Sequence, residues 1–188
     1  MFSDELKKML RLGRNPVAYA RAVQVWKEAR EIISPVSWHG VLSQQEFHDR
    51  FHPHVDSSHS LSGLCARADK VCLMAVTIGV EVEERAQNYR DQGDAFKGQL
   101  LDRMGSFLVE AKLRRLNVRL SFEWGRKGFS CTDLLSPGSG DVPLEAGAVF
   151  ATLVDSADFP ITLTPDRRIS PEKTRTGFMG LIPEQDRL

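Results

Sequence analysis

The chain has 188 residues, enough to bury a hydrophobic core as one ordinary domain. Its 25 basic and 25 acidic residues give a formal net charge of zero, which excludes a global electrostatic attraction to nucleic acid or to an anionic membrane. Three cysteines without metal-ligand spacing suit a reducing compartment, and the longest apolar run, residues 71–80, is far shorter than the roughly 20 residues that span a bilayer, so we expect a cytoplasmic protein without membrane contact.

The first part of the chain carries two signals for helix starts. Asn15-Pro16 is typical of a helix start, and apolar residues at helical spacing extend the predicted helix to Ser34-Pro35. Ser43 and Glu46 form a capping box, which predicts a short helix that ends at Pro53. The Ser- and His-rich residues that follow are expected to form a linker.

A strand and two helices are predicted in the middle of the chain. Residues 71–78 are rich in β-branched side chains and stop at Gly79, which indicates a buried strand. Residues 80–91 open with acidic side chains, which favour the positive end of a helix dipole. After Gly93, apolar side chains on one face predict a helix over residues 94–116.

The C-terminal part changes character. RLSFEW at 119–124 and FSCTDLL at 129–135 are predicted as a pair of strands joined by a turn. A helix is predicted over 143–156, and residues 161–164 and 176–182 are expected to close the fold as strands.

These elements indicate a single α+β domain with mostly antiparallel strand pairing. The sequence has no internal repeat, no low-complexity segment and no domain boundary. We expect one domain over residues 15–188, preceded by a loosely docked tail over residues 1–14.

The loop LLSPGSGDVPLE at 134–145 admits two interpretations. It lacks both the Gly-x-Gly-x-x-Gly of dinucleotide sites and the lysine of a phosphate-binding loop. Asp141 is expected to cap the next helix and Glu145 to lie in its first turn, so negative charge occupies the place that an anion would take. A tight turn and a ligand-binding loop both remain open. The Gly-Ser-Gly at 138–140 is not a nucleophile elbow, and the second half has no histidine, which excludes serine hydrolase chemistry.

All the histidines fall in one window: His39, His48, His52, His54 and His59. His48 and His52 are one helical turn apart, a spacing compatible with zinc or nickel. No His-Glu-x-x-His motif accompanies them and Pro53 interrupts the segment, so no metal site is predicted.

Basic residues gather in two runs, at 114–127 and 167–175. Acidic residues lie among them and no aromatic ladder accompanies them, which argues against a groove for nucleic acid. Each run is interpreted as a solvated face or as the rim of a docking surface for an acidic partner.

Four segments together resemble the activation domain of vitamin B12-dependent methionine synthase, which binds S-adenosylmethionine, and its stand-alone bacterial relatives. These segments are VTIGVEVEE at 76–84, LLDRMGSFLVEAKLRRL at 100–116, SPGSGDVPLEAGAVFATL at 136–153 and ITLTPDRRISPEKTRTGFMGL at 161–181. The resemblance covers about residues 71–182. Its most specific parts are Ser136-Pro137-Gly138 with Gly140-Asp141, and Pro171-x-Lys173-Thr174.

The resemblance implies a twisted antiparallel sheet flanked by helices and a loop over 134–140 that binds S-adenosylmethionine. The binding residues it implies are Ser136, Pro137, Gly138, Ser139, Gly140 and Glu110, with Lys173 and Thr174 near a docking face. In that family the domain docks on a cobalamin-carrying protein, whose oxidised cobalt is reduced by a donor of the flavodoxin type and remethylated from S-adenosylmethionine.

The chain itself has no Asp-x-His-x-x-Gly motif, so cobalamin is expected only through a partner. The resemblance points to a corrinoid protein, or a methionine synthase that lacks its own activation domain, as this partner. Any activity would belong to a methyltransferase system of the methionine synthase type.

The sequence departs from the family pattern at three ligand positions. Leu134 stands where the family has an arginine that pairs with a carboxylate, and Ser139 stands where an aromatic residue is expected. Ser106 replaces a glutamate of the long helix, with Glu110 one turn on. Loss of the charge-assisted pair and loss of the stacking face each forfeit on the order of 1 to 3 kcal/mol of binding free energy.

Three hypotheses follow. The chain is a stand-alone activation-domain homologue that binds S-adenosylmethionine and serves a corrinoid protein; it is a non-enzymatic binding or assembly module on the same fold that has lost this ligand; or its histidine segment binds a metal.

Overall fold

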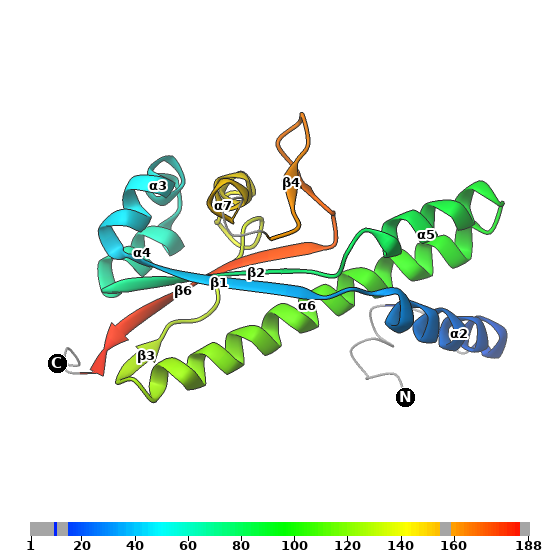
Figure 1. Ribbon diagram of the computed structural model, residues 1–188, viewed down its shortest axis with the longest axis horizontal. Helices are drawn as coiled ribbons and strands as arrows, with labels where there is room; N and C mark the ends of the chain where they lie inside the picture. Colours follow the sequence, from blue (N-terminus) through cyan, green and yellow to red (C-terminus); the bar gives the residue numbers. More distant parts are fainter. Residues whose placement is uncertain (1–9, 11–14, 155–158, 185–188) are drawn as a thin grey trace.

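The computed structural model describes residues 10, 15–154 and 159–184. A four-stranded antiparallel sheet lies between two layers of helices, with α2, α5 and α6 on one face and α3, α4 and α7 on the other (Figure 1). The strand order is β1-β2-β6-β3, and every neighbouring pair is antiparallel. This arrangement confirms the predicted α+β class.

The strands of this sheet are β1 (Val36–Ser43), β2 (Lys70–Thr77), β6 (Thr174–Pro183) and β3 (Phe129–Cys131). The helices are α2 (Pro16–Ile32), α3 (Gln44–Ser57), α4 (His59–Arg67), α5 (Glu81–Asp91), α6 (Ala95–Gly125) and α7 (Ala146–Val154). A small separate hairpin consists of β4 (Thr162–Leu163) and β5 (Ile169–Ser170).

The sheet separates two hydrophobic cores. Met74, Val76 and Met179 point toward α2, α5 and α6, whereas Leu73 and Phe178 point toward α3, α4 and α7. Because β2 is covered on both faces, its side chains are buried almost without exception. The predicted strand over 71–78 is confirmed for this reason, as are the helices that became α2 and α5.

The predicted strand over 119–124 is wrong, because α6 continues through this segment to Gly125. Leu120 lies on the buried side of the helix, one turn after Leu116. Arg119 and Glu123 face each other one turn apart, with Nε and Oε1 separated by 4.0 Å. Burial of Leu120, with a small contribution from this pair, outweighs the strand preference of the aromatic residues in the segment.

Pro53 does not end its helix, contrary to the prediction, and α3 continues to Ser57. A proline in a helix interior costs about 3 kcal/mol, but Phe47, Phe51 and Val55 are all buried along one face of α3, and each contributes about 1.5–3 kcal/mol. The predicted linker is also wrong, since residues 59–67 form α4.

Strand β1 has no counterpart among the predicted elements. Its side chains alternate between half-buried and exposed, and Trp38 packs edge-on against Phe150 with 5.8 Å between ring centroids. A single-sided edge strand buries few residues, so the run of apolar side chains that revealed β2 is missing here.

Asp141 caps a different helix from the predicted one. Its Oδ2 accepts hydrogen bonds from the Ser60 amide at 3.0 Å and from Ser58 Oγ at 3.3 Å, at the start of α4. Hydrogen bonds from Ser60 lower the Asp141 pKa from 3.8 to about 2, and the side chain of Ser60 contributes more than its backbone. The loop therefore fastens α4 to the segment before α7.

Two predictions concern segments that the structure describes only in part, the N-terminal tail and the end of the helix predicted over 143–156. Of the predicted tail, only Leu10 lies among the described residues, where it is buried in the core beneath α2 and α6; residues 155 and 156 of the predicted helix lie outside them. Cys65, Cys72 and Cys131 are free thiols. No helix in the described part of the chain has the length and hydropathy to cross a bilayer.

Candidate functional site

The loop that follows β3 lies along the free part of the β6 edge. Leu135 exchanges two backbone hydrogen bonds with Phe178, at 2.8 and 2.9 Å, and within the described residues this bridge is the last strand-like pairing on that edge. Backbone groups of alternate strand residues point to the same edge, so the N–H and C=O of Thr176 face the open edge beyond the bridge.

After the bridge the chain turns tightly. The Gly138 amide donates to the Val142 carbonyl and the Ser139 amide to the Ser136 carbonyl, at 2.9 and 3.0 Å. Gly138 and Gly140 have φ values of 78° and 60°, a region that favours glycine. Residues 138–141 are exposed and Ser136 and Pro137 are half-buried, so the predicted binding loop lies at the surface.

Leu134, the first residue of this loop, is partly buried. It packs against the core beneath α6, and its Cδ1 lies 2.6 Å from the position that a Cβ on Gly177 would take. Gly177 therefore leaves room for the leucine. The place where the family resemblance predicts an arginine is filled by an apolar contact.

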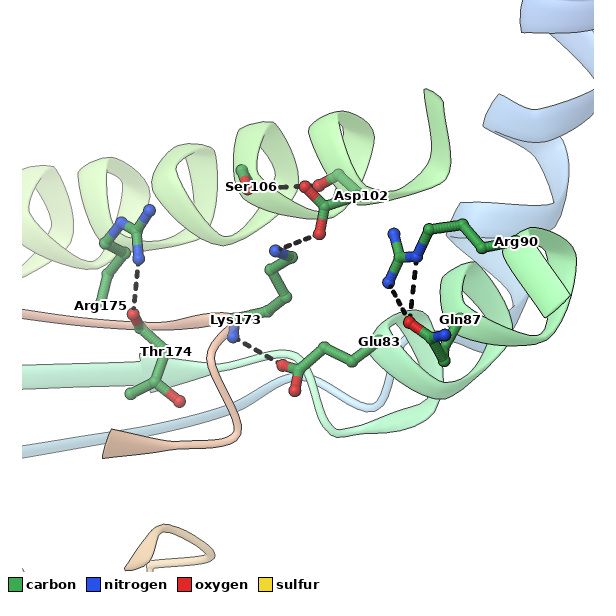
Figure 2. A network of polar contacts seen from close by, with 8 residues as sticks. All are labelled: Glu83, Gln87, Arg90, Asp102, Ser106, Lys173, Thr174 and Arg175. Atoms are coloured by element: carbon green, nitrogen blue, oxygen red, sulfur yellow. Dashed lines mark hydrogen bonds and ion pairs between the residues drawn. The ribbon is translucent and has the colours of Figure 1, made fainter. Parts of the chain in front are cut away.

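Lys173 is a buried member of the site. Its Nζ lies 2.6 Å from Asp102 Oδ1 on α6, and its amide donates to Glu83 Oε1 on α5 at 2.8 Å (Figure 2). The residue is 6% exposed. Lys173 thus connects the start of β6 to both helices of this layer rather than facing solvent.

Thr174 and Ser106 take no part in the ion pairs between α6 and β6. Thr174 follows Lys173 on the strand, so its side chain points to the opposite face of the sheet, where it is buried and its Oγ1 has no partner among the described residues. Ser106 donates to the Asp102 carbonyl at 3.2 Å, a bond within α6 (Figure 2).

Arg175 and Glu110 form the solvent-facing pair of the site. Arg175 Nε lies 3.7 Å from Glu110 Oε2, and both side chains are 40% exposed. Arg175 also donates to the Thr174 carbonyl at 2.9 Å, and Arg114 approaches Glu110 from the other side at 3.3 Å. Such an exposed pair contributes little to folding stability and can open for a charged ligand at low cost.

Arg175 and Glu110 offer one cation and one carboxylate to a charged ligand. Arg175 matches a carboxylate, and Glu110 matches an ammonium or sulfonium cation. The turn offers fewer groups for ligand contact, because Ser139 has no aromatic ring and the Gly138 and Ser139 amides are bonded within the turn. Glu110 and Arg175 lie on the α6 face of the sheet, whereas the turn after Leu135 contacts α4 and α7 on the other face.

Sequence reasoning missed the pairing roles of Arg175 and Asp102. In the sequence, Arg175 was identified only as part of a basic run. The pattern Thr-Arg-Thr was an available signal, because alternation along a strand places the arginine on one face and both threonines on the other. Asp102 carried no signal, since its role depends on how α6 crosses the start of β6.

An acidic groove of about 530 Å³ lies between α5 and the start of α6. Its charged lining comprises Glu83, Glu84, Arg90, Asp102 and Glu172. Arg90 is held by Gln87, whose Oε1 accepts from Nε and Nη2 at 3.0 and 2.8 Å (Figure 2).

Of the five histidines, His48, His52 and His54 lie on α3, whereas His39 lies on β1 and His59 begins α4. His48 and His52 share a helix face with 5.3 Å between ring centroids, and Asp56 lies 3.4 Å from His52 Nε2. Within residues 10, 15–154 and 159–184, no group of three or more His, Cys, Asp or Glu side chains is arranged to hold a metal ion.

Comparison with known proteins gives a likeness in structure rather than in sequence. No family model and no curated protein matches the sequence. Among solved structures, the chain is similar to the crystal structure of the MetH reactivation domain bound to AdoHcy, with a TM-score of 0.58 and 16% sequence identity over 93% of this chain and 69% of that one. The chain therefore has the fold of the MetH reactivation domain, at a distant level of sequence similarity.

Proposed function

We propose that the chain is a homologue of the methionine synthase reactivation domain, which binds S-adenosylmethionine and supports reductive remethylation of a corrinoid partner. The observation that carries this proposal is the Arg175–Glu110 pair, which lies exposed on the same side of the sheet as Leu134. The shared fold with a domain crystallised with AdoHcy supports the class of ligand.

The ligand is proposed to pass around the free part of the β6 edge, from Arg175 and Glu110 on the α6 face to the turn on the α7 face. Arg175 binds its carboxylate, Glu110 faces its amino group, and the surface from Ser136 to Gly140 covers the nucleoside. In the resembling family, an arginine at the position of Leu134 pairs with the ligand carboxylate. Arg175 is proposed to take this role here. Without an aromatic ring at Ser139, we expect weak binding, with a Kd on the order of 0.1 to 1 mM.

S-adenosylmethionine, when bound, supplies the methyl group for a reduced corrinoid. The chain's own residues bind and orient the ligand, since positioning is the protein's contribution in such a system. The corrinoid and the electron donor, of the flavodoxin type in the resembling family, are proposed to come from partner proteins.

Isothermal titration of the purified protein with S-adenosylmethionine, and separately with AdoHcy, tests the proposal. Arg175→Met should weaken binding by about tenfold or more, because a charge-assisted pair is lost. Arg168→Met is the matched control, since Arg168 is also an exposed arginine near a carboxylate, with 3.9 Å between Nε and Asp166 Oδ2. Absence of heat at millimolar ligand would overturn the binding of S-adenosylmethionine.

A second candidate is a binding or assembly module that has lost this ligand. It is favoured by Leu134, which fills the space over Gly177 where a ligand-pairing side chain was expected. Immobilised methionine synthase lacking its activation domain should then retain the protein while titration with S-adenosylmethionine gives no signal. Failure of both experiments would exclude both candidates.

A further inference from the structure

Strand β1 presents an uncovered edge to solvent. It is the outermost strand next to β2, and its eight residues have no strand on their other side within the described part of the chain. The Gln44 amide donates to the Asp69 carbonyl at 3.0 Å, and these residues are opposite each other in the β1–β2 register. By the alternation of an antiparallel ladder, even-numbered residues of β1 bond to β2, and Ser37, His39 and Val41 direct their N–H and C=O outward.

The same three residues also form an exposed floor on the α6 side of the sheet. Ser37, His39 and Val41 lie opposite Val76, Met74 and Cys72 of β2, whose side chains belong to the core beneath α6. All three are exposed, because α6 crosses β2 and β6 and leaves β1 uncovered. An extended segment lying along β1 would have both backbone groups and this floor within reach.

A basic wall stands beside this floor. A groove of about 300 Å³ runs between Pro35–Ser37 and α6, and its charged residues are Lys112, Arg115 and Arg119. Lys112 and Arg115 have no carboxylate within 4.0 Å among the described residues, and Arg119 has only Glu123 at that distance. Three cations with one weakly held anion favour an acidic occupant.

The outer flank of the wall is apolar. Val118 and Phe122 on α6 are 68% and 69% exposed, and they lie within one turn of Arg115 and Arg119. Exposed aromatic and arginine side chains side by side are typical of protein interfaces. A nucleic acid would satisfy the cations but could not pair with the backbone of β1, so the edge favours a polypeptide.

We propose that an acidic, extended segment of a partner protein docks in this groove. It adds a strand to β1 through the backbone groups of Ser37, His39 and Val41, and it directs alternate carboxylates to Lys112, Arg115 and Arg119. The site is separate from the Arg175–Glu110 pair, because Arg175 and Glu110 lie on the β6 side of α6. The docking function is therefore independent of S-adenosylmethionine binding.

Fluorescence anisotropy with a labelled peptide of alternating Glu and Val tests this directly, because its carboxylates share one face of a strand. Ser37→Pro removes one outward N–H without disturbing the β1–β2 ladder, and we expect about three- to tenfold weaker binding. Ser37→Ala is the matched control and should bind within about twofold of the wild type, as it keeps the amide.

The basic wall is tested by the triple variant Lys112→Gln, Arg115→Gln and Arg119→Gln, which should lower affinity by about tenfold or more. Its control carries Gln at three exposed arginines elsewhere, Arg50, Arg67 and Arg168, and should bind as the wild type. Circular dichroism establishes that each variant is folded; for a variant that fails this check, the single Arg115→Gln and Ser37→Pro variants decide.

Several results would overturn the proposal. Equal losses in the two triple variants would mean nonspecific attraction of an anion, and equal affinity for a backbone N-methylated peptide would mean that β1 adds no strand. Equally tight binding of a single-stranded oligonucleotide would indicate a polyanion surface. Concentration-dependent dimerisation that Ser37→Pro abolishes would assign the edge to a second copy of this chain instead.

Discussion

Lys173 and Asp102 form an ion pair of which only one member reaches solvent: Nζ and Oδ1 are 2.6 Å apart, and the side chains are 7% and 40% exposed, respectively. Loss of the partner is therefore more costly for the buried ammonium of Lys173 than for the half-exposed carboxylate of Asp102. The pair connects β6 to α6 next to the proposed ligand groove, so its integrity determines how that groove is built.

Asp102→Asn should therefore destabilise the fold by about 1–3 kcal/mol, because it leaves a buried ammonium without an anionic partner. Lys173→Met should cost less, below about 1 kcal/mol, since the apolar stem is retained and the half-exposed Asp102 is solvated. Urea unfolding of both variants, with Asp133→Asn as an exposed control, measures the difference. A larger loss for Lys173→Met than for Asp102→Asn would contradict this asymmetry.

The crossing of α5 and α6 predicts a strong effect at Gly98. A Cβ there would lie 2.6 Å from the Ala86 carbonyl oxygen, a backbone atom that cannot turn aside. Gly98→Ala should destabilise by about 1–3 kcal/mol, although alanine is the better helix former. Gly63 in α4 has no atom within 4 Å of its Cβ position, so Gly63→Ala should stabilise by about 0.5–1 kcal/mol. Thermal unfolding of both variants checks the contrast, and a stabilised Gly98→Ala would show that the helices lie farther apart.

Asp141 predicts a dependence of stability on acid pH. Its pKa is lowered from 3.8 to about 2 in the folded protein, so the carboxylate contributes stability that is fully present above about pH 4 and is lost as the pH falls through 2. Asp141→Asn should therefore flatten the pH dependence of the melting temperature in this window. An NMR titration of the Asp141 carboxyl measures the pKa, and an ordinary value near 3.8 would contradict the cap on α4.

The ligand groove predicts a gain of function. Leu134→Arg combined with Ser139→Tyr supplies a second cation and a stacking surface, and it should tighten the affinity for S-adenosylmethionine by about tenfold or more. Leu134→Met with Ser139→Thr is the conservative control and should leave the affinity near that of the wild type. If the gain-of-function variant binds no better, the loop does not lie against the ligand.

Local signals in the sequence predicted the parts of the fold that depend on local interactions. The Asn15 and Ser43 caps accept hydrogen bonds from the first turns of α2 and α3, as expected. The errors arose where distant contacts decide: burial of α3 carries it past Pro53, and Leu120 keeps residues 119–124 helical.

The sequence pointed to single segments of the candidate site but not to the contacts between distant segments. The family resemblance pointed to the loop at 136–140 and to Glu110 on the long helix. The partner of Glu110, Arg175, could not be identified, because the pair forms only when β6 lies beneath α6, 65 residues later in the sequence.

The central claim is that the loop and the Arg175–Glu110 pair form one ligand site. An amide NMR titration with S-adenosylmethionine tests it most directly. We predict chemical-shift changes concentrated at residues 134–140, 110 and 175–177. Changes confined to other regions, such as the acidic groove between α5 and α6, or no changes at millimolar ligand, would contradict it.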